Sequence, residues 1–121
     1  MDIKAFKMDG LGNDFVIIDR RKEDVSLSKE QIIKIGNRNN VGFDQIIFIE
    51  KKINDAFPIK IFNPDGVEVG ACGNGSRCIA YLISKENNQK KIKLKADNRI
   101  LETEILDEKM VKINMGLNKS R

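Results

Sequence analysis

Residues 71–84 have the sequence ACGNGSRCIAYLIS, and this stretch decides the architecture expected for the chain. Its second part places Ile79, Leu82 and Ile83 at helical spacing, which predicts a helix over residues 75–84 with one apolar face. Extended segments flank this helix on both sides in the sequence, and no heptad or solenoid period is visible. The pattern predicts an α+β fold in which a mostly antiparallel sheet wraps around a central helix.

A second helix is expected near the N-terminal third of the chain. Residues 28–31, SKEQ, form a capping box, in which a serine and a glutamine satisfy the first backbone N–H groups of a helix. The predicted helix covers residues 29–38 and presents Ile32, Ile33 and Ile35 as its apolar face.

Strand-like segments occupy most of the remaining chain. Residues 63–66, NPDG, predict a tight turn, because proline fixes φ and glycine allows a positive φ. This turn joins two of the segments into a hairpin, and the last three segments follow one another as a meander. The predicted strands cover residues 3–9, 15–19, 45–51, 59–63, 67–69, 92–96, 100–106 and 110–115.

The composition is typical of a globular protein with one hydrophobic core. The sequence has 121 residues, of which 40% are hydrophobic and 33% charged, and this length suits one domain. No apolar run approaches the roughly 18–20 residues that cross a bilayer, and the N-terminus lacks the pattern of a signal peptide. These features predict a cytoplasmic protein that does not bind membranes.

The net charge of +4 arises from 22 basic and 18 acidic residues that are mixed along the chain. The one dense basic cluster, Lys90, Lys91, Lys93 and Lys95, alternates with apolar residues. This alternation predicts a strand whose lysines face water. Nucleic-acid binders usually gather basic residues on one face and add stacking aromatics, so we expect no nucleic-acid partner.

The sequence contains no histidine, which removes Ser-His-Asp and Cys-His catalysis and histidine-ligated metals. The two cysteines, Cys72 and Cys78, are too few for a disulfide framework or a zinc site. We therefore expect no metal, and acid–base chemistry must use thiol, carboxylate, lysine or the single tyrosine.

Cys72 has the setting of an acid–base thiol. It precedes the predicted helix, and Gly73 and Gly75 leave the helix start open to a ligand. The first-turn N–H groups lack partners, and the positive end of the helix dipole favours the thiolate, which lowers the pKa of the thiol. Cys78 lies further along the helix, where a small buried hydrophobe is the expected role.

Three further segments have the composition of ligand-contacting loops. Residues 10–14, 41–45 and 62–66 each combine glycine with an asparagine or glutamine. Carboxamides both donate and accept hydrogen bonds, which suits a ligand that carries ammonium and carboxylate groups together. Taken one by one, such residues are more often part of turn structure.

Taken together, residues 7–15, 42–45, 61–66, 68–69 and 72–78 closely resemble the motifs of diaminopimelate epimerases, in the same order. Residues 113–116 resemble the end of that family's first domain. The resemblance implies half of a fold with two similar domains, of which residues 1–116 are the first and residues 117–121 a linker or frayed end.

The resemblance also implies an activity and a site. Family members interconvert LL- and meso-diaminopimelate without a cofactor, in lysine and peptidoglycan biosynthesis, using one cysteine on each face of the α-carbon. By matching position, Cys72 corresponds to the catalytic cysteine of the first domain. The resemblance further implies that Asn13, Gln45 and Asn63 contact the substrate and that the backbone of Gly73 and Asn74 binds its α-carboxylate.

The resemblance covers the first domain only, and a two-base inversion needs the second cysteine. Cys78 cannot replace it, because it lies on the same helix and the same side of any substrate. The chain alone is expected to be inactive. It is expected to be an excised domain or the product of a split or decaying gene, to assemble with a second-half polypeptide, or to self-associate so that two copies of Cys72 face each other. A module that binds an amino acid without catalysis is the alternative.

Overall fold

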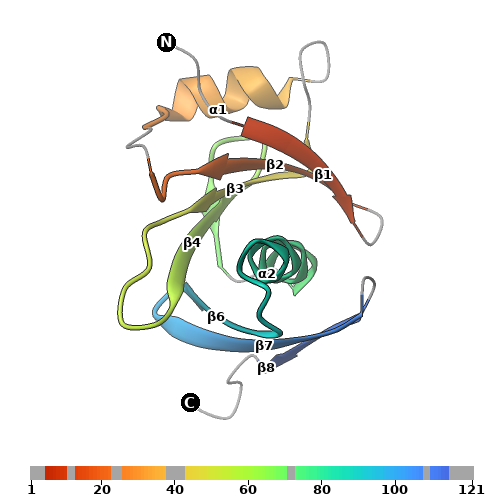
Figure 1. Ribbon diagram of the computed structural model, residues 1–121. Coiled ribbons are helices and arrows are strands. Elements are labelled where there is room, and N and C mark those ends of the chain that lie inside the picture. Colours follow the sequence, from red (N-terminus) through yellow and green to blue (C-terminus); the bar gives the residue numbers. More distant parts are fainter. Residues whose placement is uncertain are drawn as a thin grey trace.

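The computed structural model describes residues 5–10, 13–22, 26–37, 43–70, 73–107 and 110–114. These residues form two helices, α1 (Lys29–Gly36) and α2 (Gly73–Asn87), and a set of strands (Figure 1). The strands are β1 (Ala5–Gly10), β2 (Asn13–Asp19), β3 (Gln45–Ile49), β4 (Phe57–Phe62), β5 (Glu68–Val69), β6 (Lys91–Ala96), β7 (Arg99–Asp107) and β8 (Met110–Asn114).

The strands join into one mixed sheet in the order β1-β2-β3-β4-β6-β7-β8, and β5 pairs with β4 outside this path. Most neighbours are antiparallel, but β2 pairs with β3 and β4 with β6 in parallel. Each parallel pair requires a crossover, and α1 and α2 lie in these two connections. The predicted α+β class is confirmed, and the two crossovers make the sheet mixed.

The two helices lie on opposite faces of the sheet. Figure 1 shows α2 on the concave side, between β1–β4 and β6–β8, and α1 on the outer side of β2 and β3. Helix α2 contacts β1 as well as β6, β7 and β8. No helix in the described part of the chain is long and apolar enough to cross a membrane.

Strands β2 and β3 are buried on both faces, which explains their continuous apolar runs. Alternate residues divide between two core clusters. Phe15 and Ile17 belong to the cluster that contains Ile79 and Ile83 of α2. Val16 and Ile18, whose side chains point to the other face, belong to a smaller cluster beneath α1. The buried members of this cluster are Val16, Ile18, Ile32, Phe43, Ile46 and Phe48.

Helix α1 begins as its sequence predicts and ends earlier. The Ser28 hydroxyl accepts a hydrogen bond from the Gln31 N–H at 3.1 Å, and the Gln31 side chain accepts one from the Ser28 N–H at 2.8 Å. The helix ends at Gly36 rather than residue 38. The prediction of Ile33 on the apolar face was wrong. Its side chain is 44% exposed, because it lies about 100° around the helix from the buried Ile32.

The turns that follow β4 and β6 both contain residues with a positive φ, and the first has the predicted glycine at that position. In the first, the Gly66 N–H donates to the Asn63 carbonyl at 2.9 Å, and Gly66 has a φ of 83°. In the second, Asp97 and Asn98 both have positive φ, as a two-residue hairpin turn requires. Along β6, the lysines are exposed and the alternating apolar residues are buried, which confirms the predicted solvent-facing lysines.

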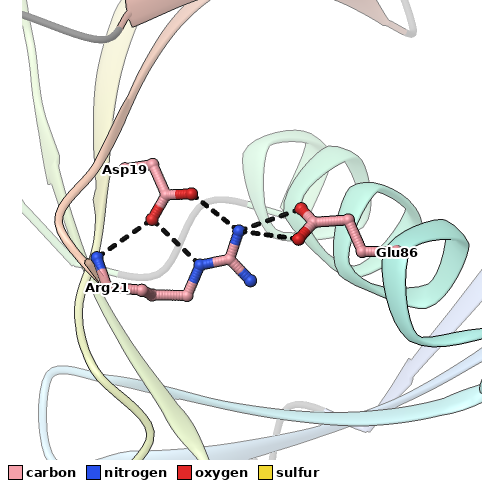
Figure 2. A network of polar contacts seen from close by, with 3 residues as sticks. All are labelled: Asp19, Arg21 and Glu86. Carbon is pink, nitrogen blue, oxygen red and sulfur yellow. Dashed lines mark hydrogen bonds and ion pairs between the residues drawn. The ribbon is translucent and has the colours of Figure 1, made fainter.

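An ion-pair network ties the last turn of α2 to the end of β2 (Figure 2). The Arg21 guanidinium contacts the Asp19 carboxylate at 2.7 and 2.9 Å and the Glu86 carboxylate at 2.9 and 3.0 Å. The hydrogen bond from Arg21 lowers the pKa of Asp19, and the same bond raises the pKa of Arg21. This network fixes one end of α2 relative to the sheet.

Candidate functional site

The carboxamides of Asn13, Gln45 and Asn63 are brought to one end of the sheet by the pairing of β2, β3 and β4. The parallel strands β2 and β3 start side by side, with Phe15 opposite Gln45. The antiparallel β4 ends next to the start of β3, with Phe62 opposite Ile46. Asn13 opens β2, Gln45 opens β3 and Asn63 directly follows β4. Asn13, Gln45 and Asn63 therefore meet at the same end of these strands, which we call the carboxamide edge.

Gln45 and Asn63 contact each other at this edge. The Gln45 Nε2 group donates to the Asn63 Oδ1 atom at 3.4 Å, and both side chains are half-buried. The hairpin turn fixes the backbone of Asn63, because the Asn63 N–H donates to the Val67 carbonyl at 3.0 Å. A contact of this length is weak, so the pair can rearrange around a ligand at low cost.

Asn13 is held by a carboxylate that the sequence analysis did not select. Its Nδ2 group donates to Asp44 Oδ2 at 3.5 Å, and the Asp14 backbone N–H donates to the same oxygen at 2.8 Å. The Asp44 N–H donates in return to the Asp14 carbonyl at 2.9 Å. Asp44 lies in a segment whose composition did indicate a ligand-contacting loop. Its partners lie about thirty residues away, however, and only the parallel pairing brings them together.

Residues 10–14 were expected to form a loop, and most of them belong to the β1–β2 ladder instead. Gly10 pairs with Asn13 and Asp9 with Asp14. Asn13 is thus the first residue of a strand rather than a loop residue. Pairing with β1 fixes the backbone of Asn13, and this sets the direction of its Cα–Cβ bond.

The start of α2 is the second part of the candidate site. The helix begins at Gly73, two residues before the predicted start, so Gly73 and Asn74 contribute backbone to its first turn. The first N–H groups of a helix lack intrahelical acceptors, and residues 73–76, GNGS, include no acidic side chain that could occupy them. Cys72 lies outside the described residues and immediately precedes Gly73 in the sequence.

Chain connectivity keeps the start of α2 close to the carboxamides. Strand β5 pairs with the last residues of β4, Val69 with Ile61. Only three residues separate Val69 from Gly73, and an extended chain of that length spans at most about 14 Å. The carboxamide edge and the first turn of α2 therefore belong to one region of the molecule.

Two buried residues complete the first turns of α2. Cys78 is 8% exposed, as expected for a small core residue. Ser76 is fully buried, and its hydroxyl has no hydrogen-bond partner in the described structure. An unsatisfied buried hydroxyl costs stability, which sets this end of the helix apart from the last turn.

Two hollows on the described surface lie away from these residues. One, of about 420 Å³, is lined by residues near the start of β4 and by β6 and β7, including Lys52, Asp55 and Phe57. The other, of about 220 Å³, lies between α1 and the outer face of β3 and β4. Among the described residues, no group of three His, Cys, Asp or Glu side chains could hold a metal ion.

Comparison with known proteins connects the chain with one family. A family model described as diaminopimelate epimerase matches residues 5–119. A diaminopimelate epimerase of Pelagibacter ubique is 51% identical over 119 residues, which cover 98% of this chain and 43% of that protein. One from Coxiella burnetii is 42% identical over 122 residues, 97% of this chain and 44% of that protein. The chain thus spans less than half the length of these relatives.

A solved structure shares the fold. A protein of Pseudomonas aeruginosa described as a predicted epimerase superposes with a TM-score of 0.60 at 15% identity, over 86% of this chain and 39% of that one. At this identity the likeness concerns the fold alone. It also covers only part of the solved chain.

Proposed function

Because the chain belongs to the diaminopimelate epimerase family, we propose that it is the first domain of a diaminopimelate epimerase. In this proposal residues 1–116 form one half of a two-domain enzyme that interconverts LL- and meso-diaminopimelate. The observation that carries the proposal is the match over 98% of the chain at 51% identity.

The proposed chemistry is a proton transfer across the α-carbon. The Cys72 thiolate removes the α-proton, and the electron pair of the broken C–H bond stays on the substrate as a carbanion. A thiol on the opposite face then gives its proton to that carbon, which inverts the centre. Each turnover leaves the first thiol protonated and the second as thiolate, ready for the reverse reaction.

The first turn of α2 supports this assignment. Its N–H groups lack intrahelical acceptors, and the positive end of the helix dipole favours an anion nearby. A substrate carboxylate held by the backbone of Gly73 and Asn74 would gain most when carbanion charge spreads into it. The same dipole favours the thiolate of Cys72. We propose that no cofactor is needed, because this end of the helix supplies the charge stabilisation.

The carboxamide edge supports a zwitterionic substrate. Asn13, Gln45 and Asn63 offer donors and acceptors within one region of the sheet, and diaminopimelate carries ammonium and carboxylate groups at both of its ends. Weak contacts among these side chains let them exchange a neighbour for a ligand without a large penalty.

One base cannot invert a stereocentre, so the proposal includes a source for the second thiol. A separate polypeptide with the second half of the enzyme is one source, and a second copy of this chain is another. In the second case two copies of Cys72 would face each other across a two-fold axis. Without either source, the chain is a module that binds an amino acid and does not invert it.

The test is α-hydrogen exchange in D2O, measured by mass spectrometry with separation of the epimers. The chain is assayed alone and together with the part of the Pelagibacter ubique relative that it does not cover. We expect exchange and inversion in the mixture and loss of both in Cys72→Ser. A mixture that assembles but exchanges no α-hydrogen would contradict the proposal, as would a Cys72→Ser variant that inverts normally.

The mass of the chain in solution separates the sources of the second thiol. A dimer of this chain that inverts diaminopimelate alone would assign both thiols to copies of Cys72. A monomer that exchanges nothing by itself would remove the homodimer. If that monomer still binds diaminopimelate, the chain acts alone as a binding module.

A further inference from the structure

We propose that Asp44 is a positioning residue that sets which end of the Asn13 carboxamide faces the ligand. The proposal rests on the proposed function, in which Asn13 contacts the substrate. Asp44 lies in one of the segments that resemble the family, but neither the resemblance nor the comparisons give this carboxylate a role.

The geometry places Asp44 where it can act on Asn13. It directly precedes β3, next to the start of the parallel strand β2. The Asp44 N–H donates to the Asp14 carbonyl at 2.9 Å, and Asp44 Oδ2 accepts from the Asp14 N–H at 2.8 Å. These two reciprocal bonds fix the carboxylate relative to the backbone of β2. The same Oδ2 atom lies 3.5 Å from the Asn13 Nδ2 atom.

The chemistry of the two groups then fixes the direction of the amide. An ionised carboxylate only accepts hydrogen bonds, whereas a carboxamide has a donor end and an acceptor end. The NH2 end of Asn13 must therefore face Asp44, and its Oδ1 end is turned the opposite way. At 3.5 Å the hydrogen bond itself is weak, so the main effect is on orientation.

Orientation decides which ligand group Asn13 can contact. A 180° rotation of the carboxamide exchanges donor for acceptor with almost no change in shape, and the wrong end against an ammonium or carboxylate leaves both groups unsatisfied. Removing the Asp44 carboxylate would take away an acceptor that favours this orientation, so the flipped amide would become more populated. The ligand would then bind only the fraction that is correctly turned.

The first experiment measures the ligand-free chain. The side-chain NH2 resonances of Asn13 and the backbone amide of Asp14 are followed by heteronuclear NMR in wild type, Asp44→Ala and Asp44→Asn. We expect Asp44→Ala to shift both signals and to speed amide exchange at Asp14. Asp44→Asn, which keeps an oxygen acceptor, should restore most of the Asp14 protection. An unchanged Asn13 signal in Asp44→Ala would overturn the proposal.

The second experiment is a double-mutant cycle on ligand affinity, with meso-diaminopimelate as the probe. We expect Asp44→Ala to weaken binding by about fivefold to tenfold in wild type, and by less than about twofold in the Asn13→Ala background. Equal losses in both backgrounds would overturn the proposal, because they would mean that Asp44 does not act through Asn13.

Asp55→Asn is the matched control. It removes one carboxylate charge near the opposite end of β4, where Asp55 is exposed and paired with Lys52 and Lys93. It should leave both the Asn13 signal and the affinity unchanged. A loss of affinity as large as that of Asp44→Ala would reduce the effect to net charge and overturn the proposal. If the wild-type chain binds no diaminopimelate by itself, the cycle is repeated on its mixture with the second half of the enzyme. An assembled mixture that neither binds nor exchanges would contradict the proposed function, while the ligand-free experiment still decides whether Asp44 orients Asn13.

Discussion

The two ends of α2 are built in opposite ways. At the last turn, charged groups of Arg21, Asp19 and Glu86 meet at 2.7–3.0 Å. At the other end, neutral carboxamides contact their neighbours at 3.4 and 3.5 Å, and the Ser76 hydroxyl is buried without a described partner. A helix of 15 residues separates the two ends by about 22 Å. One end of the helix is thus tied to the sheet by short ion pairs, whereas these two carboxamide contacts near the other end are long and weak.

Breaking the ion-pair network at the last turn of α2, the anchored end of the helix, should lower the free energy of unfolding without changing ligand affinity. Arg21→Ala removes a mostly buried guanidinium from two carboxylates, so we expect the free energy of unfolding to fall by about 1–2 kcal/mol. Urea unfolding measures this loss, and titration with meso-diaminopimelate measures affinity. Arg21→Lys, which keeps the charge but not the fork-shaped donor set, should lose less. A fall in affinity as large as the fall in stability would contradict the division between the two ends.

A substitution at the carboxamide edge should lower ligand affinity without changing the free energy of unfolding. Gln45→Ala removes a donor at 3.4 Å from Asn63, a contact too long to contribute much to folding. We expect affinity for diaminopimelate to fall about tenfold, equivalent to about 1.4 kcal/mol. The free energy of unfolding should change by less than about 0.5 kcal/mol. Destabilisation comparable to that of Arg21→Ala would show that the edge is structural.

Removing the buried Ser76 hydroxyl should change stability in the opposite direction to the loss of the Arg21 network. Ser76→Ala deletes an unsatisfied polar group and introduces a better helix former, so we expect the free energy of unfolding to rise by about 1 kcal/mol. Cys78→Ala is a suitable control, because it truncates a neighbouring buried side chain that carries no such penalty, and it should destabilise. A loss of stability in Ser76→Ala would show that the hydroxyl has a partner.

Low pH should weaken the ion pair between Asp19 and Arg21 at the last turn of α2. The pKa of Asp19 is lowered in the folded protein from its ordinary 3.8, so at low pH the unfolded chain binds more protons than the folded one. The stabilisation is complete above about pH 4–5 and is lost as the pH falls through the lowered folded pKa. The slope of unfolding free energy against pH should be shallower in Asp19→Asn than in wild type. Equal slopes would remove Asp19 as a source of acid sensitivity.

The parts of the fold that local chemistry decides were predictable from the sequence. The capping box of Ser28 and Gln31 and the turn at residues 63–66 involve neighbours in the chain, and both form as expected. The start of α2 was placed two residues late, because glycine is a weak helix former. The backbone at Gly73 is helical all the same.

The contacts that depend on strand pairing were not predictable in the same way. Hairpin turns indicate antiparallel neighbours, but no local signal shows that β2 and β3 lie side by side in parallel. The candidate carboxamides could be chosen from loop composition and the family resemblance. The role of Asp44 could not, because it depends on a register that joins residues 30 positions apart.

If the start of α2 activates the thiol of Cys72, the rate at which this thiol is alkylated should show it as a function of pH. The measurement uses Cys78→Ala, so that one thiol reacts, with and without diaminopimelate. We predict a pKa for Cys72 below that of an ordinary cysteine, and protection from alkylation by the ligand. A pKa at or above the ordinary value, with labelling that the ligand does not slow, would mean that the helix start does not activate this thiol.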